Sequence, residues 1–199
     1  MGIDREYYID RFARIFVLAI EEKINLDLIN DVLSKSNLVR NIEKNDYSEL
    51  FNDSILDIVK HYFGGCIVED NSLYNYNDAY WCGMVYMYIF YKYRKPLSYI
   101  FLVLPLKKLL DMYDVYHEMD ISAIYEVFEE ISKQKTILQL LFEKHRINNA
   151  EVAKLAGVNI STIVHLKKSD NYLYAGSFNN VHRIALALNE PDNLFLDKV

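Results

Sequence analysis

The 199-residue chain carries 22 Lys and Arg against 28 Asp and Glu, which gives a formal net charge of −6 at pH 7. Its 52% hydrophobic and 25% charged residues exclude general disorder and predict a globular protein. Six glycines and three prolines are too few for a sheet protein, which needs a turn about every eight to twelve residues. We therefore expect an all-α fold.

The composition also bears on where the protein acts. Its N-terminus, MGIDREYYIDRF, lacks the apolar run of a secretory signal, and the uncharged run 79–91 is shorter than the roughly 20 residues of a membrane-spanning helix. Cys66 and Cys82 lack the spacing of a metal site and are expected to be reduced thiols. These features predict a cytoplasmic protein with no membrane partner, no metal and no cofactor.

Apolar residues recur at helical spacing from the start of the chain. Residues 4–23 predict one helix, 25–44 predict two shorter helices with Asn25 or Asp27 as a cap, and 47–63 predict a helix that ends at Gly64 and Gly65. The inner face of the first helix is expected to hold Tyr8, Phe12, Ile15, Phe16 and Ala19.

A long aromatic helix is predicted from Ala79 to about Tyr93, with Asp78 as its cap. Residues 98–103 fit either a short helix or a buried strand. Pro105 fits the first turn of a helix over 105–119, which Asp120 interrupts before a last helix over 121–134. Residues 1–132 are thus expected to form an acidic helical domain.

An aromatic stripe runs along the long helix. It comprises Trp81, Tyr88 and Tyr91, with Tyr80 and Tyr86 beside them. Such a stripe is either helical core or a groove for a partner, since Trp and Tyr dominate the energetics of interfaces. In the second interpretation Trp81, Tyr88 and Tyr91 would bind a protein.

The C-terminal stretch NNAEVAKLAGVNISTIVHLKK (148–168) predicts two short helices joined at a glycine. Asn148 and Glu151 have the spacing of a capping box, and Gly157 is suited to the left-handed conformation that ends a helix. Val152 and Leu155 are expected on the inner face, where Ala153 lets another helix approach closely.

The second helix of this pair is expected to have one buried side and one polar side. Asn159 is its predicted cap, Ile163 and Leu166 point to the core, and Lys167 and Lys168 end it. The outward side chains are Asn159, Ile160, Ser161, Val164 and His165. Ile160 and Val164 could pack against thymine methyl groups or against another protein.

This arrangement resembles the Cro and lambda-repressor (XRE) type of helix-turn-helix, from about Thr136 to Leu196. The resemblance implies a helix over 136–146, a recognition helix over 159–168 and a closing helix over 177–189, in a compact helix-turn-helix domain over 133–199. The connection SDNYLYAG (169–176) is longer than the family's usual one and contains no basic residue. The resemblance further implies that Asn148 and Asn149 contact phosphate, and in a DNA-binding protein Lys167 and Lys168 are expected to contact phosphate as well. The outward residues of the recognition helix would contact bases.

Charge is distributed unevenly between the two parts. Residues 133–199 contain nine Lys and Arg against six Asp and Glu, whereas residues 1–132 contain thirteen against twenty-two. A weakly basic module next to an acidic one should bind DNA weakly as a monomer and in a salt-sensitive way, because phosphate contacts supply most nonspecific affinity. We therefore expect a homodimer.

A second resemblance covers about forty residues before the helix-turn-helix. Ala79, Tyr80, Trp81 and Gly83, followed by YHEMD at 116–120, are similar to a helical domain that accompanies toxin genes in bacterial toxin-antitoxin operons. It implies that this part binds a protein such as a cognate toxin.

Catalytic chemistry has no support in the sequence. His117, Glu118 and Asp120 are close together, but successive helix positions face different sides and no HExxH follows; His61 with Cys66 has the same weakness. We expect no catalytic residues. Two hypotheses follow: a sequence-specific DNA-binding regulator (a repressor or antitoxin), or an inhibitor that binds a protein through the acidic, aromatic-rich N-terminal part.

Overall fold

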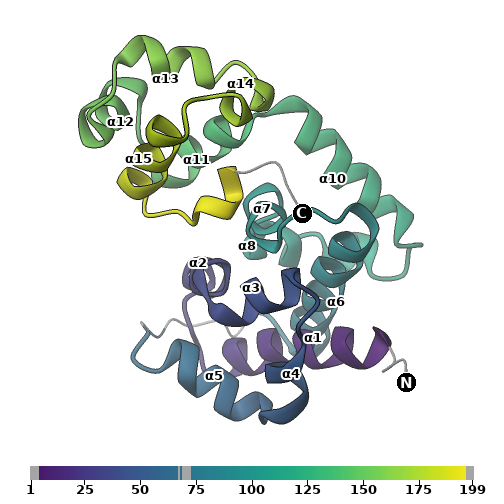
Figure 1. The fold of residues 1–199 in the computed structure, drawn as a ribbon. Coiled ribbons are helices and arrows are strands. Elements are labelled where there is room, and N and C mark those ends of the chain that lie inside the picture. Colours follow the sequence, from purple (N-terminus) through teal and green to yellow (C-terminus); the bar gives the residue numbers. More distant parts are fainter. Residues whose placement is uncertain (1–4, 67, 69–72, 196–199) are drawn as a thin grey trace. The chain divides into compact units, whose positions relative to one another are not determined.

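The computed structural model of the protein describes residues 5–66, 68 and 73–195 (Figure 1). In these residues the regular structure comprises fifteen α-helices and one 3-10 helix, and the β-type pairing is confined to an isolated bridge between Ile24 and Val68. The all-α prediction is confirmed. Among the same residues, no helix combines the length and apolarity needed to cross a bilayer.

The chain divides into two compact units, Met1–Glu126 and Val127–Val199. The division falls inside helix α10 (Ser122–Gln134), as does the boundary after residue 132 that the sequence suggests.

The core of the first unit forms where α1 (Arg5–Glu21) packs against α6 (Tyr76–Tyr93). Phe12 and Phe16 of α1 are fully buried, as expected, and the Phe16 ring lies 5.3 Å from that of Tyr86. Tyr86 is buried with both its hydrogen-bonding functions used: its hydroxyl donates to the Leu104 carbonyl and accepts from the Asn30 amide, each at 2.9 Å. A buried polar group satisfied in this way fixes its neighbours at little cost.

Two segments expected as single helices are each divided. Residues 47–63 form α4 (Ser48–Asn52) and α5 (Ile55–Phe63), because the hydroxyl of Ser54 caps a new helix by accepting from the Asp57 N–H. Residues 105–119 form α8 (Leu106–Leu110) and α9 (Tyr113–Tyr116). Pro105 occupies the cap of α8 and not its first turn.

The remaining helices of this unit agree with the sequence except at one cap. Asn25 caps α2 (Leu26–Lys35), α3 (Asn37–Glu43) follows it, and residues 98–103 lie in the wholly buried α7 (Leu97–Val103), which selects the helix over the strand. The prediction that Asp78 caps α6 is wrong. Asn75 is the cap, and Asp78 is its capping-box partner, since its carboxylate accepts from the Asn75 N–H at 2.9 Å.

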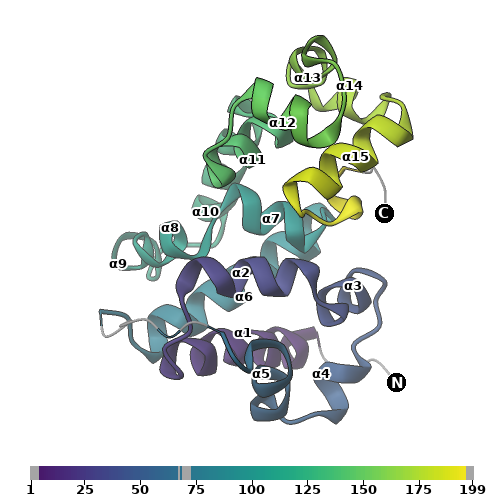
Figure 2. The same cartoon turned by 90° about the vertical axis from the view of Figure 1, so that its left-hand side faces the viewer.

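The second unit is a bundle of short helices (Figure 2). It contains α11 (Ile137–His145), α12 (Asn149–Ala156), α13 (Ile160–Leu166), α14 (Asp170–Tyr174), α15 (Phe178–Leu188) and the 3-10 helix η1 (Asp192–Phe195). Helix α12 packs against both α13 and α15. Residues 169–176, expected as a connection, contain α14, which begins where the Ser169 hydroxyl accepts from the Asn171 N–H.

Candidate nucleic-acid interface

The start of α12 is fixed by the predicted capping box. The Asn148 side-chain oxygen accepts from the N–H groups of Ala150 and Glu151, at 2.9 and 3.1 Å, and the Glu151 carboxylate accepts from the Asn148 N–H at 2.9 Å. These bonds satisfy amides that the helix itself leaves without partners. The oxygen of Asn148 is therefore occupied, and its NH₂ is the group that remains for a phosphate.

The turn between α12 and α13 depends on Gly157. Its φ of 60° and ψ of 39° place it in the left-handed region, as predicted, and its N–H donates to the Ala153 carbonyl. The guanidinium of Arg183, from α15, lies where a Cβ on residue 157 would be. Arg183 is exposed, so α15 contributes a cation beside this turn.

The inner face of α12 is displaced from the one predicted. Val152 is fully buried as expected, but Leu155 is 62% exposed and the prediction for it is wrong. Successive residues are about 100° apart around a helix, so Val152, Ala156 and Ala153 form one arc that α13 and α15 cover, and Leu155 lies outside it. The alanines let the neighbouring helices approach on that side.

Helix α13 has the two faces predicted for it. Ile163 and Leu166 are buried, and all five outward positions (Asn159, Ile160, Ser161, Val164 and His165) are exposed. Asn159 occupies the cap position but makes no side-chain capping bond, so the prediction of its capping bond is wrong. Its side-chain amide is consequently free to contact something else.

His165 is supported by a residue that the sequence did not indicate. Its ring stacks on that of Tyr172, with centroids 4.4 Å apart and planes inclined by 20°. Tyr172 belongs to α14, in the segment expected as a connection. The Ser-Asp-Asn start of this segment is the sequence signal of a capped helix.

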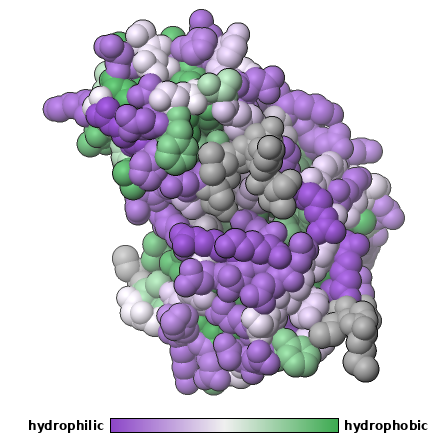
Figure 3. Space-filling model, in the orientation of Figure 1, coloured by the Kyte–Doolittle hydropathy of each residue, from purple (hydrophilic) through white to green (hydrophobic). Residues whose placement is uncertain are grey.

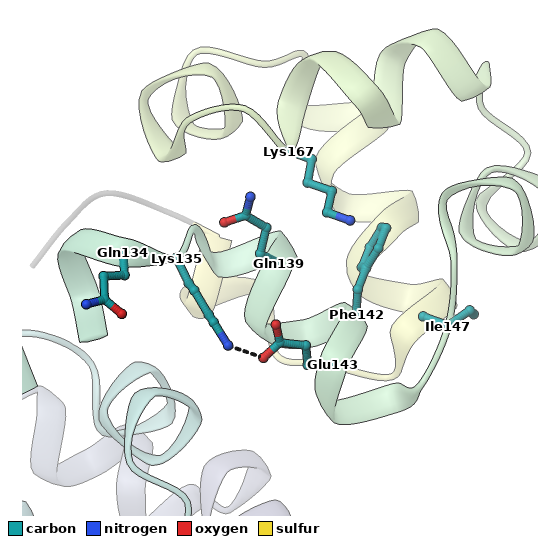
Figure 4. Close-up of a pocket in the computed structure, with 7 residues that line it drawn as sticks. All are labelled: Gln134, Lys135, Gln139, Phe142, Glu143, Ile147 and Lys167. Atoms are coloured by element: carbon teal, nitrogen blue, oxygen red, sulfur yellow. Dashed lines mark hydrogen bonds and ion pairs between the residues drawn. The ribbon is translucent and has the colours of Figure 1, made fainter. Parts of the chain in front are cut away.

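Lys167 links the end of α13 to two other helices. Its ammonium lies 4.5 Å from the centroid of the Phe142 ring of α11 (Figure 4). It also donates to the side-chain oxygen of Asn149 at 3.4 Å. Two predicted phosphate contacts, Lys167 and Asn149, are thus adjacent, where the end of α13 lies beside the start of α12. Lys168 follows and is exposed.

Several basic side chains of this unit are already paired. Lys144 and His145 both contact the buried Glu190 carboxylate at 2.6 Å, and Lys135 pairs with Glu143 at 2.7 Å. Exposed cations that form no ion pair with any residue of the described ranges are Arg146, Lys154, Lys168 and Arg183. Lys154 and Arg183 belong to no sequence pattern. They add two exposed cations to the predicted DNA-binding residues.

Apolar side chains also reach this surface. Ile160 and Val164 are 50% and 42% exposed, between the polar positions of α13. Figure 3 shows hydrophobic residues interspersed with hydrophilic ones over the part of this unit that contains α12 and α15. A mixed surface of this kind can meet thymine methyl groups in a major groove or a second protein.

The aromatic stripe of α6 separates into two environments. Trp81 is 9% exposed and packs edge-to-face with the Tyr113 ring at 5.7 Å between centroids, so only a small part of it is accessible for the predicted partner binding. Tyr86, beside it in the stripe, is core. Trp81 and Tyr86 are buried because α1, α7 and α9 pack against the hydrophobic face of α6.

Tyr88 and Tyr91 are half-buried and remain accessible. Tyr88 donates to the Glu6 carboxylate at 3.3 Å, and Tyr91 forms a 3.1 Å hydrogen bond with the Tyr47 hydroxyl while the Arg5 guanidinium lies 4.1 Å from its ring centroid. Burial, with the Tyr47 hydrogen bond, raises the pKa of Tyr91. This second group is an aromatic surface carrying a cation.

The ring of Tyr113 lies between Trp81 of α6 and His117 at the end of α9. Trp81 contacts Tyr113, whose ring stacks on His117 at 4.4 Å, and His117 Nδ1 lies 2.9 Å from the Tyr113 carbonyl. His117 and Glu118 approach to 3.6 Å. Within the described part of the chain, no three His, Cys, Asp or Glu side chains are grouped so as to hold a metal ion.

Comparison with protein-family models, with curated proteins and with solved structures finds no match for this chain. The function proposed below therefore depends on the geometry of α11 to α15 and on its surface chemistry.

Proposed function

We propose that the protein is a sequence-specific DNA-binding regulator that acts through α12 and α13. The observation that carries the proposal is the helix pair itself: a capping box at Asn148, a left-handed turn at Gly157, and a second helix that buries Ile163 and Leu166 while its opposite face is exposed. A short exposed helix held in this way by a preceding helix has the form of a recognition helix.

In this proposal α13 enters the major groove. Ser161, His165 and Asn159 contact base edges, Ile160 and Val164 contact thymine methyl groups, and the Tyr172 ring holds the His165 imidazole in place. Phosphate is contacted by Asn148, Asn149, Lys167 and Lys168, with Lys154 and Arg183 as further candidates.

We further propose that the protein acts as a homodimer and represses transcription, either as a simple repressor or as an antitoxin that binds its own operator. Two copies would contact half-sites about 34 Å apart, one turn of the duplex. Dimerisation doubles the phosphate contacts, which a unit with a small excess of positive charge requires.

Fluorescence anisotropy of the full-length protein tests the proposal. A labelled duplex from the region upstream of its own gene is compared with a scrambled duplex of equal composition, at low and physiological salt. Tighter binding to the natural duplex, reduced by Ser161→Ala with His165→Ala, is expected. Equal binding to both duplexes, or binding that the double substitution leaves unchanged, contradicts sequence-specific recognition by α13.

A second candidate function, inhibition of a partner protein, is favoured by the first unit. Tyr7 and Phe51 are 38% and 53% exposed, with ring centroids 6.2 Å apart, and the guanidinium of Arg11 lies 5.8 Å from the Tyr7 centroid. Exposed aromatic and Arg side chains are the commonest hot spots of protein interfaces. Tight co-purification with the product of a neighbouring gene, without a DNA signal, would favour this function.

A further inference from the structure

A cleft of about 550 Å³ opens on the second unit, along α11 and beside the end of α13 (Figure 4). Its volume lies within the roughly 300–1,000 Å³ of pockets that bind small molecules. All of its lining residues belong to helices or turns between Gln134 and Lys167. No role in contacting DNA bases accounts for this cleft.

The walls of the cleft combine apolar surface with hydrogen-bond donors. Phe142 and Ile147 supply the apolar part, and the Lys167 ammonium lies above the Phe142 ring. Gln139 is also in the wall, and its side-chain oxygen accepts from the Thr136 N–H at 2.8 Å. Because the oxygen is engaged, the NH₂ of Gln139 is the group left to donate to a ligand.

The charge of the cleft is not balanced. Lys135 is neutralised by Glu143, at 2.7 Å from Nζ to Oε2. Lys167, in contrast, donates only to the neutral amide of Asn149 and contacts an aromatic face, and no carboxylate of the described ranges pairs with it. A half-buried ammonium beside an apolar wall attracts an anion more strongly than a fully solvated one does.

We propose that this cleft binds a small organic anion, an apolar body carrying one carboxylate or phosphate group, with the anionic group on Lys167. The body lies against Ile147 and the small exposed part of Phe142, which is 5% exposed, and the Gln139 NH₂ donates the second hydrogen bond. A bound anion also engages the residue that lies beside Asn149, so it withdraws one predicted phosphate contact and adds negative charge near the duplex. This coupling rests on the proposed DNA binding, whereas the ligand site itself does not.

Titration of the ¹⁵N-labelled full-length protein tests the site without DNA. The probes are benzoate and phenyl phosphate, with benzamide as the neutral control and inorganic phosphate as the anion without an apolar body. Saturable shifts of the Gln139, Phe142 and Lys167 amide signals are expected with the two organic anions, and weaker binding with inorganic phosphate. No saturable shift with either organic anion, or equal shifts with benzamide, overturns the proposal.

Two substitutions move the expected affinity in opposite directions. Lys167→Gln should weaken benzoate binding about tenfold or more, since a charge-assisted hydrogen bond is lost. Glu143→Gln frees Lys135 from its ion pair and should tighten the binding of benzoate. This variant keeps the proposal testable if Lys167→Gln impairs folding. Unchanged affinity in a folded Lys167→Gln protein, or in Glu143→Gln, contradicts the assignment.

The coupling has its own measurement. Saturating benzoate should raise the Kd for the operator duplex several-fold in the wild-type protein and have no effect in Lys167→Gln. If benzoate binds while the Kd for DNA stays the same, the coupling is wrong. If the protein fails to bind DNA at all, the titration without DNA still decides on the ligand site.

Discussion

The carboxylate of Asp170 accepts a hydrogen bond from the backbone N–H of Ile137, with 2.8 Å between oxygen and nitrogen. Ile137 is the first residue of α11 and Asp170 the first of α14, so one short helix supplies a cap to another 33 residues earlier. The Thr136 hydroxyl reinforces this junction by donating to the Lys167 carbonyl at 3.1 Å. The start of α11 and the end of α13 are thereby joined.

Asp170→Ala should destabilise the second unit. The Ile137 N–H loses its acceptor, and the positive end of α11 loses a negative charge, which together should lower the free energy of unfolding by about 1–2 kcal/mol. The free energy of unfolding is measured by urea denaturation monitored by circular dichroism. Asp170→Asn is the matched control: it keeps an acceptor without the charge and should show a smaller loss. An unchanged urea midpoint for Asp170→Ala would refute the role of the cap.

Lys168→Gln should weaken DNA binding without destabilising the fold. Lys168 is exposed and forms no ion pair with a described residue. Its substitution should remove one phosphate contact and reduce the slope of the logarithm of the DNA association constant against the logarithm of the salt concentration by about 0.9. Lys133→Gln, on α10 and paired with Glu129, is the control and should leave the slope as it is. If the slope of Lys168→Gln equals that of the wild type, Lys168 lies outside the DNA footprint.

Val164→Asp tests whether the exposed apolar positions of α13 face DNA. Val164 is 42% exposed, so a carboxylate is tolerated there, but it would oppose the negative charge of the duplex. Affinity for DNA should fall at least tenfold, a loss of about 1.4 kcal/mol, in the anisotropy assay. Val164→Ser is the control, with a smaller loss. Equal DNA affinity in Val164→Asp and the wild type would remove this face from the interface.

The local signals of the fold could be predicted from sequence. The capping box of Asn148 and Glu151, the left-handed Gly157 and the buried Ile163 each depend on residues within a few positions of one another. Such short-range geometry is the same in any protein that contains the pattern. For this reason the sequence predicts the helix pair and the exposed positions of its second helix.

Features that depend on distant helices could not be predicted in this way. Leu155 is exposed because α13 and α15 cover the alanine side of α12. Trp81 is buried because Tyr113 of α9 packs against it. Tyr172 supports His165 only because a turn after Lys168 folds into α14. Helical periodicity gives the width of an apolar face but not which edge of it a neighbouring helix covers.

Asp10 should contribute to stability at neutral pH and lose this contribution in acid. Partial burial acts to raise the pKa of its carboxyl, but hydrogen bonds from Arg14 and Tyr80 and the charges of Arg14 and Arg11 together lower it. A carboxyl whose pKa is lower in the folded state stabilises the fold above its unfolded pKa of about 4, and loses this effect as the pH falls through the folded pKa.

Thermal unfolding of Asp10→Asn between about pH 7 and pH 3 measures this contribution. The substitution should lower the Tm at pH 7, and the difference from the wild type should narrow as the pH falls. Tyr80→Phe removes the hydrogen bond from Tyr80, leaves those from Arg14, and should show an intermediate effect. A Tm difference that stays constant over the whole range would show that the charge of Asp10 has no part in the stability.

Gly83→Ala should separate the two helices at the centre of the first unit. A Cβ on residue 83 of α6 would overlap the Ala13 Cα of α1 and lie 3.0 Å from a ring carbon of Phe16. Alanine gains about 1 kcal/mol over glycine in helix propensity, but overpacking a buried contact costs about 1–3 kcal/mol. Because backbone cannot move aside as a side chain can, the expected net effect is a loss of stability.

The measurement is the urea midpoint of the first unit, and Asn77→Ala on the exposed side of α6 is its control. The control changes helix propensity without touching α1, so its free energy of unfolding should stay within about 0.5 kcal/mol of the wild type. If Gly83→Ala is as stable as Asn77→Ala, the crossing of α1 and α6 is looser than the contact between Gly83 and Ala13 indicates. If it is less stable, the small residue at position 83 is what allows Phe16 and Tyr86 to pack in one core.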